Sequence, residues 1–220
     1  MTGQLCSPRT LALFVTLLVT AAAAAEQRAQ SRSVATEKIF EALAIREGGT
    51  VCEIGAGDGE LSLAVAKLVG PAGRVYTSEL GDDRVKTLQQ KVTASGLAHV
   101  TVVTGDATKT NFPDAACDAL FLRNVYHHFE DPAAMNTSMA AAVKPGGRVA
   151  VVDFTPPGKE ADRPTDRDKD GMHGISAESL SRELKEAGFE HIASELGSQR
   201  WFMVVVSKPR GAEESLIANL

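Results

Sequence analysis

The first stretch of this sequence that could do chemistry is a run of glycines beside an acidic residue. The run Glu53–Gly59 reads Glu-Ile-Gly-Ala-Gly-Asp-Gly, so its three glycines stand at alternate positions. Apolar residues that suit a buried strand precede the run, and a helical pattern follows it. Glycines let the backbone turn sharply and approach a ligand closely. Open α/β sheets bind nucleotide-like ligands at such a turn between the first strand and a helix.

The spacing of the glycines excludes two kinds of phosphate-binding loop. A dinucleotide site needs Gly-x-Gly-x-x-Gly, whereas here Glu60 stands where the third glycine is required. A phosphate P-loop is excluded as well, because no Gly-Lys-Ser/Thr follows. The run is therefore either an ordinary strand-to-helix turn or a site for another ligand.

Two further acidic residues follow predicted strands. Glu79 comes near the end of the strand predicted over 74–80, where a carboxylate can accept hydrogen bonds from both hydroxyls of a ribose. Asp106 follows the strand predicted over 100–104, in a Gly-Asp-Ala turn. Aspartate is also a common turn former, so this second signal is weaker alone.

Residues suited to acid–base chemistry gather after the fourth predicted strand. Tyr126, His127 and His128 are consecutive there, and the expected strand order puts them opposite the glycine run. We expect at least one of the two histidines to pack structurally. His173 lies in the long polar loop 156–174 and is predicted to close over the same opening.

The elements that must position these residues alternate between strands and helices. The glycine run should open a helix with Leu61, Ala64, Val65 and Leu68 on its inner face. The strands are predicted at 51–54, 74–80, 100–104, 112–122, 149–154, 192–196 and 201–207. The last two form an antiparallel hairpin. This pattern predicts an α/β fold with a doubly wound sheet.

Five motifs in order give the chain a resemblance to a known family. They are the glycine run, Glu79, Asp106, the segment Arg123–Phe129 and the turn Lys144–Gly147 (Lys-Pro-Gly-Gly). Together they resemble the class I S-adenosylmethionine-dependent methyltransferases, and most of all the subgroup of ubiquinone/menaquinone C-methyltransferases. The resemblance covers about residues 34–208 and implies a seven-stranded sheet in the order 3-2-1-4-5-7-6.

The resemblance also implies S-adenosylmethionine as the cofactor. Asp106 is expected beside the adenine amino group, and Arg123 with Asn124 beside the methionine end. Tyr126, His127 and His128 are the catalytic candidates, and Tyr126 and His173 are the candidates for contact with the acceptor. The residues expected to bind the cofactor are Glu53, Gly55, Ala56, Gly57, Gly59, Glu79, Leu80, Asp106, Ala107 and Asn124.

A small-molecule acceptor fits this sequence better than a macromolecule. The chain lacks the Asn-Pro-Pro-Tyr motif of methyltransferases acting on amino groups of DNA and protein, and its net charge of −5 argues against nucleic-acid binding. The sequence does not fix an oligomeric state. The alternative function is an exported, non-catalytic module that binds S-adenosylmethionine or another nucleoside.

No metal site is predicted from the sequence. The run Asp166–Gly171 is similar to the start of an EF-hand loop, but Ala177 stands where that loop needs its glutamate. Cys52 and Cys117 fall inside predicted core strands and are interpreted as structural, with a disulfide between them left open.

The N-terminus has the pattern of a secretory signal peptide. Arg9 precedes an apolar run over 11–19, five alanines and a polar segment. We therefore expect a signal peptide or N-terminal anchor over 1–25, a linker over 26–33, the methyltransferase domain over 34–208 and a tail over 209–220. The protein would be periplasmic or secreted. A cytoplasmic protein with a misplaced start is the alternative.

Overall fold

The computed structural model describes residues 34–197 and 199–211. The predicted signal peptide, the predicted linker and most of the predicted tail lie outside these residues. Within the described part, no helix is long and apolar enough to cross a membrane.

Strands and helices alternate along the chain as the sequence pattern predicts. The strands are β1 (Thr50–Ile54), β2 (Arg74–Glu79), β3 (Val100–Thr104), β4 (Cys117–Arg123), β5 (Val143–Phe154), β6 (Glu190–Leu196) and β7 (Trp201–Ser207). The α-helices are α2 (Thr36–Ala42), α3 (Glu60–Val69), α4 (Asp82–Ser95), α5 (Pro132–Ala142) and α6 (Ala177–Glu186). Two short 3-10 helices, η1 (Tyr126–His128) and η2 (Pro164–Asp166), interrupt the connections.

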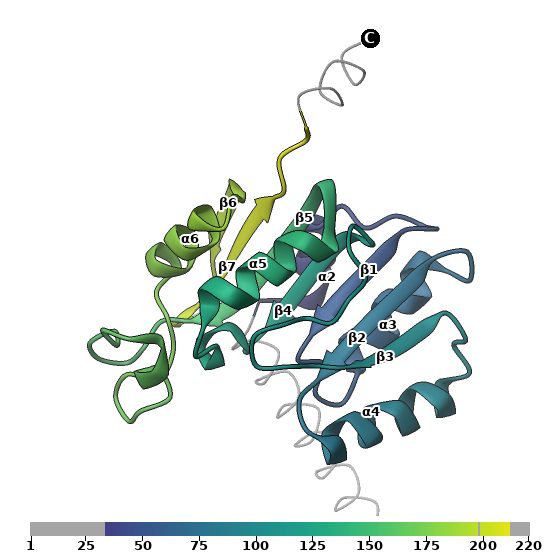
Figure 1. Cartoon of the computed structure of the whole chain (residues 1–220), viewed down its shortest axis with the longest axis horizontal. Coiled ribbons are helices and arrows are strands. Elements are labelled where there is room, and N and C mark those ends of the chain that lie inside the picture. Colours follow the sequence, from purple (N-terminus) through teal and green to yellow (C-terminus); the bar gives the residue numbers. More distant parts are fainter. Residues whose placement is uncertain (1–33, 198, 212–220) are drawn as a thin grey trace, which may run out of the picture.

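The seven strands form one sheet in the order β3-β2-β1-β4-β5-β7-β6 (Figure 1). The strands from β3 to β5 run parallel, whereas β7 is antiparallel to both β5 and β6. This order and the antiparallel C-terminal hairpin confirm the predicted fold. The strand order reverses between β1 and β4. In sheets of this kind, ligands bind in the crevice outside the carboxyl ends of the strands at such a reversal.

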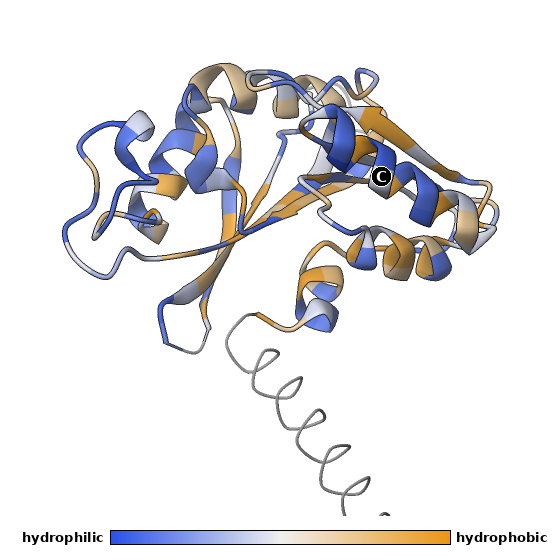
Figure 2. Cartoon of the chain, turned by 90° about the horizontal axis from the view of Figure 1, so that it is seen from below, coloured by the Kyte–Doolittle hydropathy of each residue, from blue (hydrophilic) through white to orange (hydrophobic). Residues whose placement is uncertain are grey.

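Apolar residues fill both faces of the sheet. One cluster packs α5 and α6 against it through Met135, Met139, Leu180 and Leu184. The other cluster packs α2, α3 and α4 against the opposite face and includes the fully buried Ile39. Figure 2 shows the hydrophobic residues concentrated along the central strands. Helices thus pack against both faces of the sheet.

Some details of the elements differ from the expectation. Leu68 is 50% exposed, since the inner face of α3 is formed by Leu61, Ser62, Val65, Ala66 and Val69. The predicted face for α3 was therefore wrong by part of a turn. The fourth strand begins only at Cys117, and β5 already includes the Lys144–Gly147 turn as an irregularity in its pairing with β4.

Cys52 of β1 and Cys117 of β4 form a disulfide, the bond that the sequence leaves open. Both side chains are fully buried, and their Cα atoms are 5.8 Å apart. The bond joins the two strands that flank the reversal of the sheet. It lies within the apolar cluster under α5, so its role in the fold is structural.

Candidate functional site

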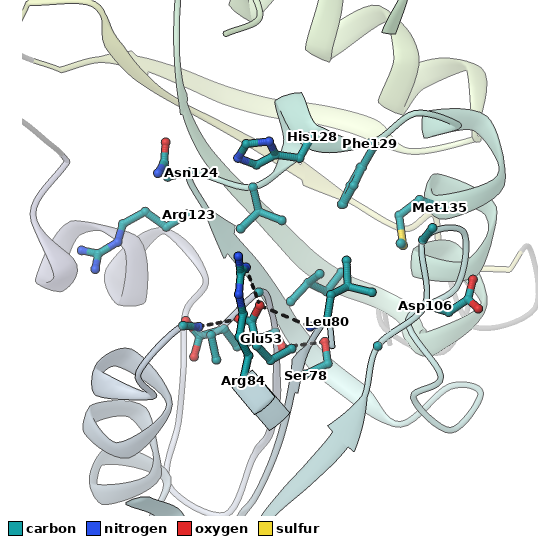
Figure 3. A pocket seen from close by; sticks show the side chains of 18 of the residues that line it. Glu53, Ser78, Leu80, Arg84, Asp106, Arg123, Asn124, His128, Phe129 and Met135 are labelled. Atoms are coloured by element: carbon teal, nitrogen blue, oxygen red, sulfur yellow. Dashed lines mark hydrogen bonds and ion pairs between the residues drawn. The ribbon is translucent and has the colours of Figure 1, made fainter. Parts of the chain in front are cut away.

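A cavity of about 690 Å³ opens at the carboxyl ends of β1, β2 and β4. This volume lies in the range of small-molecule sites. Figure 3 shows Glu53, Ser78 and Leu80 on one side of the opening, with His128, Phe129 and Met135 opposite. Nine of the ten residues expected to bind the cofactor line the cavity, namely Glu53, Gly55, Ala56, Gly57, Glu79, Leu80, Asp106, Ala107 and Asn124.

The glycine run forms the floor of the cavity, and its three glycines have different surroundings. A Cβ atom on Gly55 would lie 2.5 Å from Val125 Cγ2, so only glycine lets the end of β4 approach. Gly57 has φ +57°, and a Cβ atom there would point into open space. Gly59, the one expected residue outside the lining, faces Leu88 of α4 instead. The backbone at Gly57 is therefore open to a ligand.

The carboxylate of Glu79 is held at the end of β2 against the glycine run. Its Oε2 atom accepts a hydrogen bond of 2.7 Å from the Gly57 backbone N–H. Its Oε1 atom accepts from the Leu80 backbone N–H and from Arg84. A carboxylate offers about four acceptor positions, so Glu79 can still accept from a ligand hydroxyl. The side chain is 6% exposed, which fixes its direction.

Glu53 is the second acidic group at this end of the cavity. Burial raises its pKa from 4.5 to about 7, although the hydrogen bond from the Ser62 hydroxyl and the charge of Arg123 oppose this. The negative charge of Glu79 adds to the increase. A carboxyl group with such a pKa can change its protonation when a charged ligand arrives.

The far ends of the cavity are formed by Asp106 and by Arg123 with Asn124. Asp106 is exposed and accepts hydrogen bonds from the backbone N–H and hydroxyl of Thr108, which lower its pKa. Asn124 has φ +61°, a left-handed conformation that asparagine tolerates better than most residues. This conformation turns the chain at the end of β4.

Tyr126 and His127 do not line the cavity, contrary to the expectation that they project toward an acceptor. The Tyr126 hydroxyl donates to Glu183 of α6 at 3.0 Å, and burial together with this carboxylate raises its pKa. His127 Nδ1 lies 2.8 Å from Asp153 Oδ1, and both side chains are fully buried. The tight η1 turn directs these two residues into the core and leaves only His128 facing the cavity.

The polar loop after β5 lies beside these histidines. His173 Nε2 is 3.0 Å from His127 Nε2, although His173 itself does not line the cavity. Burial and the neighbouring His127 lower the pKa of His173. Asp168 of the same loop is 2.8 Å from His128 Nδ1. Asp153 of β5 and Asp168 are not among the predicted site residues, because sequence spacing does not show which acid meets a histidine.

A profile described as a methyltransferase domain matches residues 52–151 of the chain. The match covers the glycine run, Glu79, Asp106 and β4, so it includes most of the cavity. Residues 52–151 therefore form a methyltransferase domain of the class I, S-adenosylmethionine-dependent type.

The curated relatives with the same kind of domain include quinone-pathway enzymes. The domain is 37% identical over 124 residues to a ubiquinone/menaquinone biosynthesis C-methyltransferase of Ectopseudomonas mendocina. The alignment covers 54% of this chain and 47% of that protein. A Pseudomonas putida enzyme of the same name is 35% identical over 123 residues, covering 54% and 46%. The alignments thus span about half the length of these relatives.

Solved structures share the fold of the domain at low sequence identity. A methyltransferase dependent on S-adenosylmethionine from Aquifex aeolicus superposes with a TM-score of 0.67 at 23% identity, covering 78% of this chain and 88% of that one. The [4+2]-cyclase SpnF superposes with a TM-score of 0.69 at 20% identity, covering 80% and 81%. One fold therefore carries two kinds of reaction, so the site must decide the function of this domain.

The cavity fits S-adenosylmethionine on the evidence of its own residues. The buried carboxylate of Glu79 keeps an acceptor position for a ribose hydroxyl, and the open Cβ direction of Gly57 leaves room for a ligand against the backbone. Asp106 lies within the same lining and is exposed.

Proposed function

We propose that the domain transfers the methyl group of S-adenosylmethionine to a small-molecule acceptor. The observation that carries this proposal is the pairing of buried Glu79 with the Gly57 amide at the edge of the cavity. The bound cofactor would supply an electrophilic methyl group. Glu79 would hold the ribose and Asp106 the adenine, while Arg123 and Asn124, which also line the cavity, would border the methionine end.

The acceptor would enter on the side of His128, Phe129 and Met135. Phe129 and Met135 offer an apolar surface, and His128 adds one polar ring to it. Such a surface suits a flat, partly apolar molecule better than a peptide or a nucleic acid strand. The names of the curated relatives, which act in quinone biosynthesis, support a phenol or quinol as the first acceptor class to test.

The domain needs mainly to align the acceptor with the methyl donor. Methyl transfer from a sulfonium is an in-line displacement, so correct positioning accounts for much of the rate. A base is required only if the acceptor must lose a proton. Among the histidines and tyrosine predicted to act here, His128 alone borders the cavity.

The experiment is a turnover assay with S-adenosylmethionine and a panel of phenols, quinols and small amines. Formation of S-adenosylhomocysteine and of the methylated acceptor would be followed by mass spectrometry. We expect turnover with at least one phenol or quinol. Tight binding of S-adenosylmethionine without turnover on any member would instead favour a binding module without catalysis, and formation of a product without methylation would favour another reaction on this fold.

A further inference from the structure

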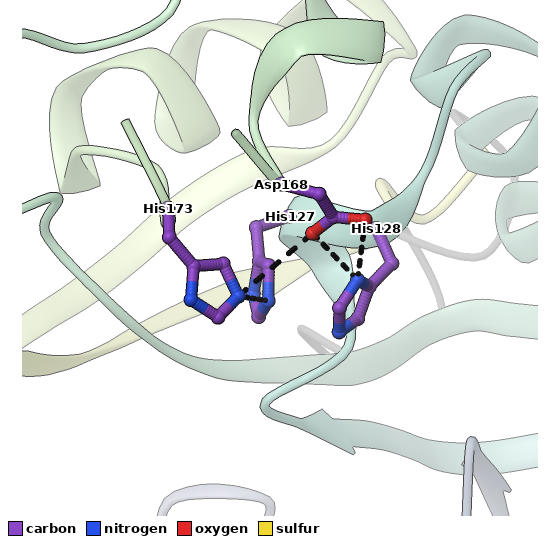
Figure 4. Close-up of side chains that lie close together, drawn as sticks. All are labelled: His127, His128, Asp168 and His173. Atoms are coloured by element: carbon purple, nitrogen blue, oxygen red, sulfur yellow. Dashed lines mark hydrogen bonds and ion pairs between the residues drawn. The ribbon is translucent and has the colours of Figure 1, made fainter. Parts of the chain in front are cut away.

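Three histidines and one aspartate converge beside the cavity. Their ligand atoms, one from each of His127, His128, Asp168 and His173, all lie within 4.8 Å of one another. Figure 4 shows the two loop residues, Asp168 and His173, facing the two histidines of η1. The imidazole rings of His127 and His128 are 4.0 Å apart between centroids, and those of His127 and His173 are 4.7 Å apart.

His127 is oriented as a metal ligand would be. Its Nδ1 atom lies 2.8 Å from the carboxylate of Asp153, which also accepts from the backbone N–H groups of His127 and Phe154. With Asp153 as acceptor, Nδ1 carries the proton and Nε2 presents its lone pair toward His173. A carboxylate behind a histidine is the usual support of a histidine that binds zinc.

The other three side chains complete a set that is reachable from solvent. His128, Asp168 and His173 have exposed side-chain fractions of 49%, 57% and 50%. His173 Nε2 lies 3.0 Å from His127 Nε2 and 3.8 Å from Asp168 Oδ1. Donor atoms around a tetrahedral zinc ion are about 3.3 Å apart, so small rotations of exposed side chains would suffice.

The loop that carries Asp168 and His173 is anchored next to both of them. Arg167 is 4% exposed and forms an ion pair with Glu183 of α6. Gly174 has φ +125°, and a Cβ atom there would lie 2.4 Å from the Phe154 carbonyl oxygen. The glycine thus allows the loop to pass directly against the end of β5. Buried contacts therefore anchor the backbone next to both Asp168 and His173.

We propose that His127, His128, Asp168 and His173 bind a zinc ion beside the cavity, next to the wall that His128 forms. Three imidazole nitrogens and one carboxylate oxygen form a donor set that zinc accepts, whereas calcium prefers oxygen ligands alone. The ion would fasten the loop over 155–176 to η1, one side chain away from the cavity that His128 lines. This inference rests on the cluster alone and holds whether or not methyl transfer is correct.

The ligand set also explains why the sequence does not reveal the site. His127 and His128 are adjacent in the chain, but Asp168 and His173 come 40 or more positions later, without the close spacing of common zinc motifs. Asp168 lies within the run that imitates an EF-hand loop. In the structure, however, Asp166 of that run pairs with Arg163 and Lys169 rather than with the cluster.

The test measures zinc binding directly. The full chain would be prepared with a histidine-free affinity tag, stripped with a chelator and titrated with zinc chloride, with bound metal counted by mass spectrometry. We expect one ion per chain and a higher melting temperature with zinc than without it. Asp168→Asn and His173→Ala should each weaken zinc binding at least tenfold, because the first replaces a charged carboxylate with a neutral amide and the second removes an imidazole donor.

Two matched variants serve as controls. Asp170→Asn changes a neighbouring exposed acid outside the cluster, and His191→Ala removes an exposed histidine on β6. Both should bind zinc as the wild type does. Absence of binding at micromolar zinc, or equal weakening by the control variants, would overturn the proposal. Because the readouts are metal content and melting temperature, failure here would leave the proposed methyl transfer unaffected.

Discussion

Glu53 is a carboxyl group that the fold buries completely, and its pH behaviour follows from this position. Its pKa is raised from 4.5 to about 7 by burial. The folded state therefore holds the proton more tightly than the unfolded state. The stability from this proton is complete below pH 4.5 and is lost as the pH rises through about 7.

Replacing Glu53 by glutamine should remove this dependence, because the amide cannot ionise. Between pH 5 and pH 8 the wild type should lose roughly 2–3 kcal/mol of unfolding free energy relative to Glu53→Gln. Urea denaturation of both proteins at the two pH values measures the difference. Parallel pH curves would show that Glu53 is not the group that titrates.

His128 is the residue by which the acceptor end can be tested separately from the cofactor end. His128→Ala should lower kcat/KM for the acceptor at least tenfold, while the affinity for S-adenosylmethionine stays within about twofold. The reason is that His128 borders the cavity opposite Ser78 and Leu80, the two neighbours of Glu79 in the chain (Figure 3). His191→Ala is the matched control. A parallel loss of cofactor affinity in His128→Ala would show that His128 contacts the cofactor rather than the acceptor.

Single-residue roles were the hardest part to predict. Glu79 ends β2 and Asp106 follows β3, and the carboxyl ends of parallel strands are where ligands bind in such sheets. Tyr126 and His127 follow a strand too, but the 3-10 turn rotates them into the core, where Glu183 and Asp153 receive them. Which of three consecutive side chains faces a cavity depends on contacts that are remote in sequence.

The elements themselves were predictable because alternation of patterns fixes their type. Confirmed features are the order of the strands and the antiparallel C-terminal hairpin. The predicted inner face of α3 was wrong, since Leu68 is apolar yet exposed. Buried Ser62 takes a core position instead, held by Glu53 and Thr77. Hydrophobicity alone cannot reveal such a polar contact.

The disulfide between Cys52 and Cys117 ties β1 to β4 over a separation of 65 residues. Closing a loop of that length should stabilise the fold by about 4 kcal/mol, mostly through the unfolded chain. Unfolding experiments with and without a reductant should show this loss for the wild type. A double variant with alanine at both positions should be insensitive to the reductant. Equal behaviour of the two proteins would mean that the bond does not form in solution.

We propose that residues 1–25 direct export of the whole molecule. The disulfide between Cys52 and Cys117 supports this proposal, since such bonds persist mainly in oxidising compartments. Mass spectrometry of protein from the native host should find a mature N-terminus between Ala23 and Gln27. Fractionation should recover the protein outside the cytoplasm. An intact N-terminus in the soluble cytoplasmic fraction would support the misplaced start instead.

Calorimetric titration with S-adenosylmethionine tests whether this cavity binds the cofactor through Glu79. Hydrogen bonds to a charged acceptor contribute about 1.5–3 kcal/mol each, so Glu79→Ala should bind at least tenfold more weakly than the wild type. Asp82→Ala, which removes the same charge from the exposed first turn of α4, should bind as the wild type does. Equal affinities for the wild type and Glu79→Ala would show that Glu79 does not bind the cofactor.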